Sequence, residues 1–214
     1  MAAPKFSTPE VVRVFPTFVW KTLLLGAQRD AVNAAIRDTL HAIRRGLPDP
    51  GPGETWQSNH GLHELEALRG FVSCVESAVE TVLDFLKIGY DEYEITGCWA
   101  TLSTRGAAHR MHAHPNNFLS GVYYVQVHDG ANTINFHDPR PQTGIMRPPV
   151  TELTHYNTDQ VVFKVEDGTL LVFPAWLPHS VDASGADRLR ISVSFNMMFS
   201  RFGETLGRPL WGER

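Results

Sequence analysis

The chain has 214 residues, 43% of them hydrophobic and 20% charged, which is typical of one globular domain with a core of its own. Its 23 acidic residues outnumber 19 basic ones, and the net charge of −4 argues against nucleic-acid binding, which needs a basic face. Two cysteines are read most simply as reduced core residues, and no apolar stretch is long enough for a membrane span. We therefore expect a soluble, cytoplasmic protein with neither a membrane nor a nucleic-acid partner.

The first part of the chain carries two helical patterns. Apolar residues recur at three- and four-residue steps over residues 30–45 and again over residues 62–88. The Gly- and Pro-rich stretch 46–61 between them is predicted to be a loop. We expect a single domain over residues 1–214, in which about residues 1–89 form a helical support.

After Gly89 the chain changes to short runs rich in β-branched and aromatic residues. Turn dipeptides such as Asp129-Gly130 and Asp167-Gly168 separate these runs. Many short strands with regular turns predict a β-sandwich or barrel over about residues 90–200. The helices would pack against one of its sheets, which gives a mainly β fold with N-terminal helices.

Three histidines crowd into HRMHAH, directly before a strand-like run. His112 and His114 are two residues apart, so on a strand both imidazoles would point to one face. His109 is three residues before His112, and on a continuous strand it would point to the opposite face. His179 ends the distant segment DGTLLVFPAWLPH. Two imidazoles on one face and a third from elsewhere would form a facial metal site, whereas the pair alone would be read as solvated surface residues.

The segment DRLRISVSFNMMF (187–199) alternates between apolar and polar residues. The apolar face holds Leu189, Ile191, Val193 and Phe195, and the polar face holds Arg188, Arg190, Ser192, Ser194 and Asn196. The polar face either meets solvent or lines a barrel interior that holds an anionic ligand. In the second case Arg190 would be the natural bidentate partner of a carboxylate.

These segments together resemble the Fe(II)- and 2-oxoglutarate-dependent oxygenases. HAHPNNFLSGVYYVQV, INFHDPR, GTLLVFPAWLPHSV and RLRISVSFNMMF stand in the order and spacing of a bacterial and phage family of 2-oxoglutarate/Fe(II) oxygenases with an HxH…H…R motif. The similarity covers about residues 97–199. It implies a double-stranded β-helix, a jelly-roll or cupin-like barrel with helices supporting one sheet. It also implies a non-haem dioxygenase of the hydroxylase type, with Fe(II) as metal and 2-oxoglutarate as co-substrate.

The resemblance also implies roles for individual residues. His112, His114 and His179 would be the iron ligands at the catalytic centre, and Arg190 would bind the distal carboxylate of 2-oxoglutarate. Tyr124, in GVYYV, would donate to the same carboxylate, although core packing explains it nearly as well. Residues near the mouth would contact a small-molecule or peptide substrate, and each also has an ordinary structural explanation: Asn116, Asn117, His137, Arg140 and Trp176.

One position departs from the superfamily pattern, because His114 stands where a carboxylate is usual. Three neutral imidazoles also suit Zn(II), Ni(II) or Cu(II), and three-histidine iron sites resemble those of thiol dioxygenases. Two alternatives therefore stay open: a three-histidine dioxygenase that does not use 2-oxoglutarate, and a non-catalytic cupin-like metal-binding protein. Asp138 would be a hidden carboxylate ligand or, more simply, a turn residue before Pro139. The C-terminal MMFSRF fits a homodimer contact or a final core strand.

Overall fold

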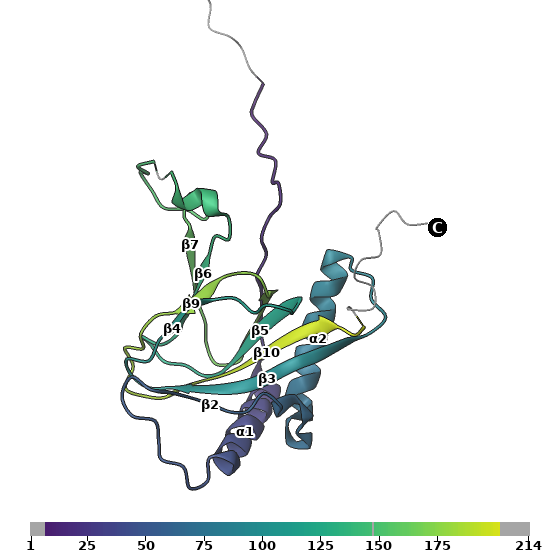
Figure 1. Cartoon of the computed structure of the whole chain (residues 1–214), viewed down its shortest axis with the longest axis vertical. Coiled ribbons are helices and arrows are strands. Elements are labelled where there is room, and N and C mark those ends of the chain that lie inside the picture. Colours follow the sequence, from purple (N-terminus) through teal and green to yellow (C-terminus); the bar gives the residue numbers. More distant parts are fainter. Residues whose placement is uncertain (1–6, 147, 202–214) are drawn as a thin grey trace, which may run out of the picture.

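The computed structural model describes residues 7–146 and 148–201 (Figure 1). Two long helices precede most of the strands. In chain order the elements are β1 (Trp20–Leu23), α1 (Gly26–Ile43), β2 (Thr55–Gln57), the 3-10 turns η1 (Leu62–Glu64) and η2 (Glu66–Leu68), α2 (Arg69–Leu86), β3 (Tyr93–Ser103), β4 (His109–His112), β5 (Leu119–Gln126), β6 (Thr133–His137), η3 (Pro141–Gly144), β7 (Gln160–Lys164), β8 (Thr169–Pro174), β9 (His179–Val181) and β10 (Arg190–Phe199).

The strands form two sheets. The larger sheet has the order β1-β8-β5-β10-β3-β2, the smaller one has the order β4-β9-β6-β7, and neighbouring strands in both are antiparallel. Figure 1 shows α1 and α2 on the outer face of the larger sheet. This is the predicted double-stranded β-helix with helices supporting one sheet. None of the described helices combines the length and apolar character that crossing a bilayer requires.

The alternation predicted for the last strand is confirmed. Ile191, Val193 and Phe195 of β10 pack into the core cluster that also holds the apolar faces of α1 and α2. Arg190 and Ser192, with side chains on the opposite face, line the barrel interior. Because successive side chains of a strand point to opposite faces, β10 packs against the helices with one face and lines the barrel interior with the other.

The N-terminal region differs from the sequence prediction in three places. The predicted loop contains β2, and an unpredicted edge strand, β1, pairs with β8. The single helix predicted over 62–88 is two 3-10 turns followed by α2. The reason lies at Gly61, which forms a parallel bridge to Cys98 of β3 and holds the chain along the sheet before a helix can begin. This tertiary contact leaves no trace in the apolar spacing.

Gly121 of β5 lies directly opposite Phe195 of β10 and has no room for a side chain. An added Cβ would lie 2.2 Å from Cζ of Phe195 and 2.7 Å from the carbonyl oxygen of Leu171. We expect Gly121→Ala to lower the free energy of unfolding by about 3 kcal/mol or more, because a buried ring and a backbone strand would both have to move. Urea denaturation measures this. Gly70→Ala on α2, where the Cβ meets nothing within 4 Å, is the control and should be neutral or slightly stabilising.

Candidate metal centre

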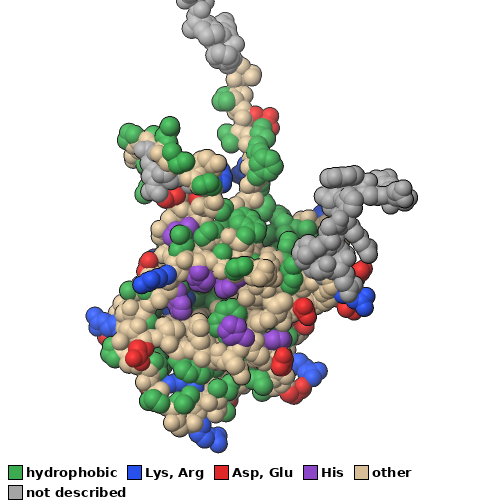
Figure 2. Space-filling model, viewed as in Figure 1, with side chains coloured by type: hydrophobic (Ala, Val, Ile, Leu, Met, Phe, Trp, Pro, Cys, Tyr) green, Lys and Arg blue, Asp and Glu red, His purple; other side chains and the backbone are tan. Residues whose placement is uncertain are grey.

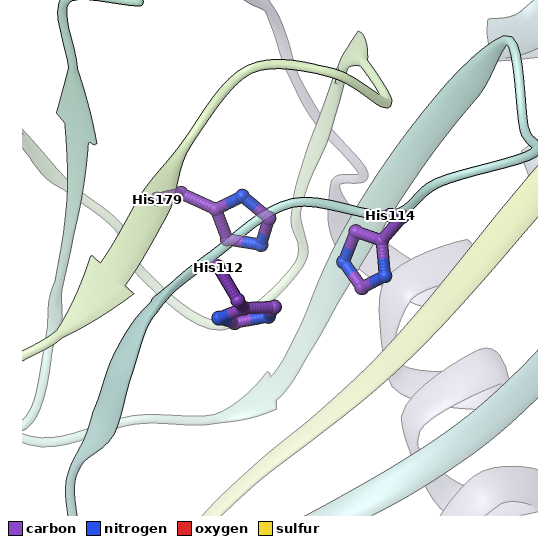
Figure 3. Close-up of side chains that lie close together, drawn as sticks. All are labelled: His112, His114 and His179. Atoms are coloured by element: carbon purple, nitrogen blue, oxygen red, sulfur yellow. The ribbon is translucent and has the colours of Figure 1, made fainter.

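Three histidines meet at the mouth of the barrel (Figure 3). His112 ends β4 and lies directly opposite His179, the first residue of β9. His114 follows in the loop, where its backbone N–H donates to the carbonyl oxygen of Ala175 at 2.8 Å. One ring nitrogen from each of the three lies within 4.8 Å of the others. The predicted cluster therefore forms, although β4 ends at His112, so the pair does not lie along one strand as expected.

Two of these rings have one nitrogen fixed by a backbone carbonyl. Nδ1 of His112 lies 2.8 Å from the carbonyl oxygen of Arg110, and Nδ1 of His179 lies 3.0 Å from that of Leu177. A carbonyl oxygen only accepts, so each Nδ1 donates its hydrogen when the ring is neutral. The lone pair is then on Nε2, which is the tautomer that a metal ligand needs.

The cluster also favours neutral imidazoles. Burial lowers the pKa of His114 to about 4, with a further lowering from the neighbouring His112. Burial likewise lowers the pKa of His179 to about 4, against the opposing hydrogen bond to Leu177. Imidazole must be deprotonated to bind a metal, so these two rings meet that requirement well below neutral pH.

The low pKa values predict an acid-sensitive metal-free protein. Unfolded histidines take up protons near pH 6.5, whereas His114 and His179 do so only near pH 4 in the fold. Between those values the unfolded chain binds more protons, so the free energy of unfolding falls as the pH falls from about 6.5 to about 4. Urea midpoints at two pH values in this range measure the slope. The double variant His114→Gln, His179→Gln should show a shallower one, and an unchanged slope would contradict the prediction.

A small cavity of about 70 Å³ runs from the histidines into the barrel. Figure 2 shows histidine side chains gathered around a hollow on this face. Trp99 and the three clustered histidines line its mouth, and the apolar side chains of Val122, Ile134 and Phe173 line its wall. Arg190 and Tyr124 also line it. The cavity therefore connects a set of metal-type ligands with a buried cation.

Arg190 and Tyr124 form a buried pair. Their exposed fractions are 3% and 0%, and the guanidinium carbon lies 5.1 Å from the centre of the phenol ring. Burial raises the pKa of Tyr124 to about 12, with the charge of Arg190 opposing, so the phenol keeps its proton. The guanidinium of Arg190 is close enough to act on the Tyr124 hydroxyl by charge and by hydrogen bonding, but within the described chain neither the hydroxyl hydrogen of Tyr124 nor Nε of Arg190 has an acceptor. Both are unsatisfied donors on one cavity, which calls for an acceptor from a ligand.

His109 is the residue that the sequence reasoning misplaced. Its partner across the β4–β9 ladder is Val181, while His112 pairs with His179, so three steps on β4 match two steps on β9. This β-bulge turns His109 to the same face as His112, and both line the cavity. Burial, and then the charge of Arg190, lower the pKa of His109. Strict alternation predicted the opposite face, because a bulge cannot be read from spacing alone.

The predicted substrate residues lie around the cavity rather than in it. Nε2 of His137 lies 2.8 Å from the hydroxyl of Ser180. Trp176 is 54% exposed on the turn before His179, and Asn116 is exposed with a left-handed φ of 63°. Asn117 is held locally, because its side chain bonds both Thr96 and Pro115. None of the four lines the cavity.

Arg140 and Asp138 are engaged with each other. The Arg140 guanidinium donates to both carboxylate oxygens of Asp138 at 2.9 and 2.6 Å, and this bond holds the pKa of that carboxyl below its usual value. Asp138 is not among the side chains that converge on the histidines. The turn role predicted for it agrees with its bond to the backbone N–H of Arg140.

An aromatic wall beside the metal ligands was not predicted. Trp99 of β3 has its ring centre 5.9 Å from that of His114. His60 stacks on Trp99 at 4.5 Å, with an angle of 18° between the ring planes. Trp99 and Thr101 are two residues apart on β3, so their side chains point to the same face, and both line the cavity. This two-residue spacing was the signal that could have identified Trp99.

Comparisons with known proteins agree with this architecture. Residues 97–196 match the model of a family described as "Putative 2OG-Fe(II) oxygenase". Among curated proteins, none is significantly similar to the chain in sequence.

Solved structures resemble the chain in fold. A prolyl-4-hydroxylase of Pseudomonas putida is 18% identical, with a TM-score of 0.57 over 86% of this chain and 93% of that one. The epimerase SnoN of nogalamycin biosynthesis is 12% identical, with a TM-score of 0.62 over 86% and 77%. HygX of Streptomyces hygroscopicus is 11% identical, with a TM-score of 0.60 over 86% and 83%. Residues 97–196, just under half of the chain, are therefore similar to a family of 2-oxoglutarate/Fe(II) oxygenases, and the solved structures share the fold of the chain.

Proposed function

We propose that the chain is a non-haem Fe(II)- and 2-oxoglutarate-dependent oxygenase of the hydroxylase type. One observation carries the proposal: a single cavity has three convergent imidazoles at its mouth, and on its wall lie buried donors of Arg190 and Tyr124 that have no acceptor among the described residues. A metal site alone would not need a buried guanidinium. A 2-oxo dicarboxylate would use both, since one end chelates a metal and the other carries a carboxylate.

The donor set fits a ferrous ion. His112, His114 and His179 would hold it through neutral ring nitrogens, and two of the three rings are already oriented by backbone carbonyls. When bound with 2-oxoglutarate, the iron supplies oxidising power from dioxygen, coupled to decarboxylation of the co-substrate to succinate. HygX was solved with nickel and 2-oxoglutarate, and SnoN with Fe3+ and alpha ketoglutarate.

The protein side of the mechanism is positioning and exclusion of water. Arg190 would bind the distal carboxylate of 2-oxoglutarate with a charge-assisted bond, and the protonated phenol of Tyr124 would donate to it. The apolar wall residues Val122 and Phe173 would keep water from the space between the carboxylate and the metal. These residues hold the co-substrate in one orientation, so that dioxygen and substrate meet at a fixed place.

The missing carboxylate ligand changes the charge of the site. Three neutral imidazoles add no negative charge, so Fe(II) and Arg190 together bring three positive charges against the two negative charges of 2-oxoglutarate. A carboxylate ligand would reduce the positive charge by one. The histidine at position 114 should therefore strengthen the binding of the dianion rather than prevent it.

A second candidate keeps the same metal site without the co-substrate. Among the described residues, the ligand group contains histidines alone, as in a three-histidine dioxygenase that does not use 2-oxoglutarate. A non-catalytic cupin-like metal-binding protein would have the same site. Neither explains why Arg190 is buried on the cavity without a carboxylate among its described partners, so we place both behind the first proposal.

The substrate is proposed at the level of its class, a small molecule or a peptide. A prolyl hydroxylase from Trichoplax adhaerens was solved with a hypoxia inducible factor peptide fragment, and HygX was solved with hygromycin B. Proteins with this fold therefore bind molecules of both kinds. In this chain the stacked pair of His60 and Trp99 lies beside His114, and Trp176 is exposed on the turn before His179, where either kind would approach.

The test is anaerobic reconstitution with Fe(II) followed by 2-oxoglutarate. We expect the weak visible charge-transfer band of a chelated 2-oxo acid, which appears only when iron and co-substrate are both present. Admission of air should then produce succinate. Iron binding without the band would favour the three-histidine dioxygenase. Retention of zinc after purification under air-free, iron-replete conditions would favour the binding protein.

A further inference from the structure

The β-bulge in β4 delivers an imidazole to the barrel interior that the proposed mechanism does not use. His109 and His112 both line the cavity, although only His112 belongs to the metal-ligand group. Nε2 of His109 is buried and, within the described chain, has no hydrogen-bond partner. A buried polar atom without a partner is rare in folded proteins, and each case requires an explanation.

Two other cavity residues share this property. Among the described residues, the hydroxyl hydrogen of Tyr124 and Nε–H of Arg190 are also buried donors without an acceptor, although the two side chains act on each other. His109 lies near enough to Arg190 for the guanidinium charge to act on its ring. Three unsatisfied groups on one small cavity point to one shared ligand rather than to three separate defects.

The chemistry of the three groups identifies the part of the ligand that they would bind. A guanidinium and a phenol are donors at neutral pH, and a neutral imidazole donates from the nitrogen that carries hydrogen. Arg190 also brings a buried positive charge that no described carboxylate neutralises. A carboxylate has two oxygens with about four acceptor sites, so it satisfies all three donors and the charge together.

We propose that His109 is a third binding residue for the distal carboxylate of the co-substrate, donating from Nε2 beside Arg190 and Tyr124. The inference rests on the proposed function and adds to it one residue and one structural device. The bulge in β4 is what makes the contact available. Without it, His109 would face away from the cavity, and the carboxylate would have two protein donors in place of three.

The experiment separates the distal carboxylate from the metal-binding end of the ligand. Calorimetry on the Ni(II)-loaded protein measures Kd for 2-oxoglutarate and for 2-oxopentanoate, which has a methyl group in place of that carboxylate. We expect His109→Leu to raise Kd for 2-oxoglutarate about 10-fold, the effect of one bond to a charged group, and to leave Kd for 2-oxopentanoate unchanged. His109→Gln, which keeps a donor, should recover part of the loss.

His128→Gln is the matched control, because Nε2 of His128 is also buried without a partner among the described residues but does not line the cavity. It should leave both Kd values unchanged. An unchanged Kd for 2-oxoglutarate in His109→Leu, with Arg190→Met strongly weakened, would overturn the role of His109 and leave the proposed function standing. An equal loss for both ligands would overturn it too, since His109 would then act at the metal end. No binding of 2-oxoglutarate by the wild-type Ni(II) protein would overturn the proposed function itself.

Discussion

His179→Ala is expected to weaken Fe(II) binding by more than about 100-fold, which exceeds the usual effect of removing only a hydrogen-bond partner of a ligand. His179 is the ligand contributed by β9, far along the chain from the other two, and it is 5% exposed. Its loss leaves two imidazoles, of which one is held only by a loop. Turnover dependent on 2-oxoglutarate should disappear with the metal. Competition with a colorimetric chelator measures the affinity.

His137→Ala provides the matched comparison for that variant. His137 is also an imidazole on the smaller sheet, and its ring is hydrogen-bonded to Ser180, the neighbour of His179. It is not in the ligand group, so its removal should leave Fe(II) affinity within a few-fold of the wild type. If His179→Ala kept wild-type affinity while still folded, as judged by circular dichroism, the proposed ligand set would be wrong.

What could be predicted from the sequence depended on strict periodicity. The alternation of β10 placed Arg190 and Phe195 on opposite faces and left solvent or the barrel interior open for Arg190. The separation of the faces holds because β10 pairs with β3 without a register shift from Arg190 to Asn196, and the structure places Arg190 on the interior side. The long-range meeting of His112 and His179 could not be obtained from spacing. It followed from the resemblance to a family and is realised by the register of β4 against β9.

The errors all occur where a tertiary contact overrides a local pattern. His109 was given to the wrong face because the bulge adds one residue to β4. β1 was not predicted, since its four residues gain their strand partners only from β8, about 150 residues further on. Arg140 was expected near the substrate, but its pairing with Asp138 uses the guanidinium locally. Such pairings depend on neighbours that a single sequence does not reveal.

Arg190→Met is expected to change ligand binding and stability in opposite directions. Methionine keeps most of the side-chain length without the charge. The Kd for 2-oxoglutarate should rise by about 100-fold or more, because the loss of a buried guanidinium partner of a carboxylate corresponds to roughly 3 kcal/mol. Metal affinity should stay unchanged, since Arg190 is outside the ligand group.

The ligand-free variant should nevertheless be at least as stable as the wild type. Arg190 is 3% exposed, and in the ligand-free chain no described carboxylate neutralises it, so its burial opposes folding. A thermal scan of both proteins with and without 2-oxoglutarate, each loaded with Ni(II), tests this. We expect the co-substrate to raise Tm for the wild type and not for Arg190→Met. A lower Tm for the ligand-free variant would mean that Arg190 serves the fold, and an equal rise on adding the co-substrate would mean that another group holds the carboxylate. The predicted pattern is that of a binding residue whose burial is compensated only by its ligand.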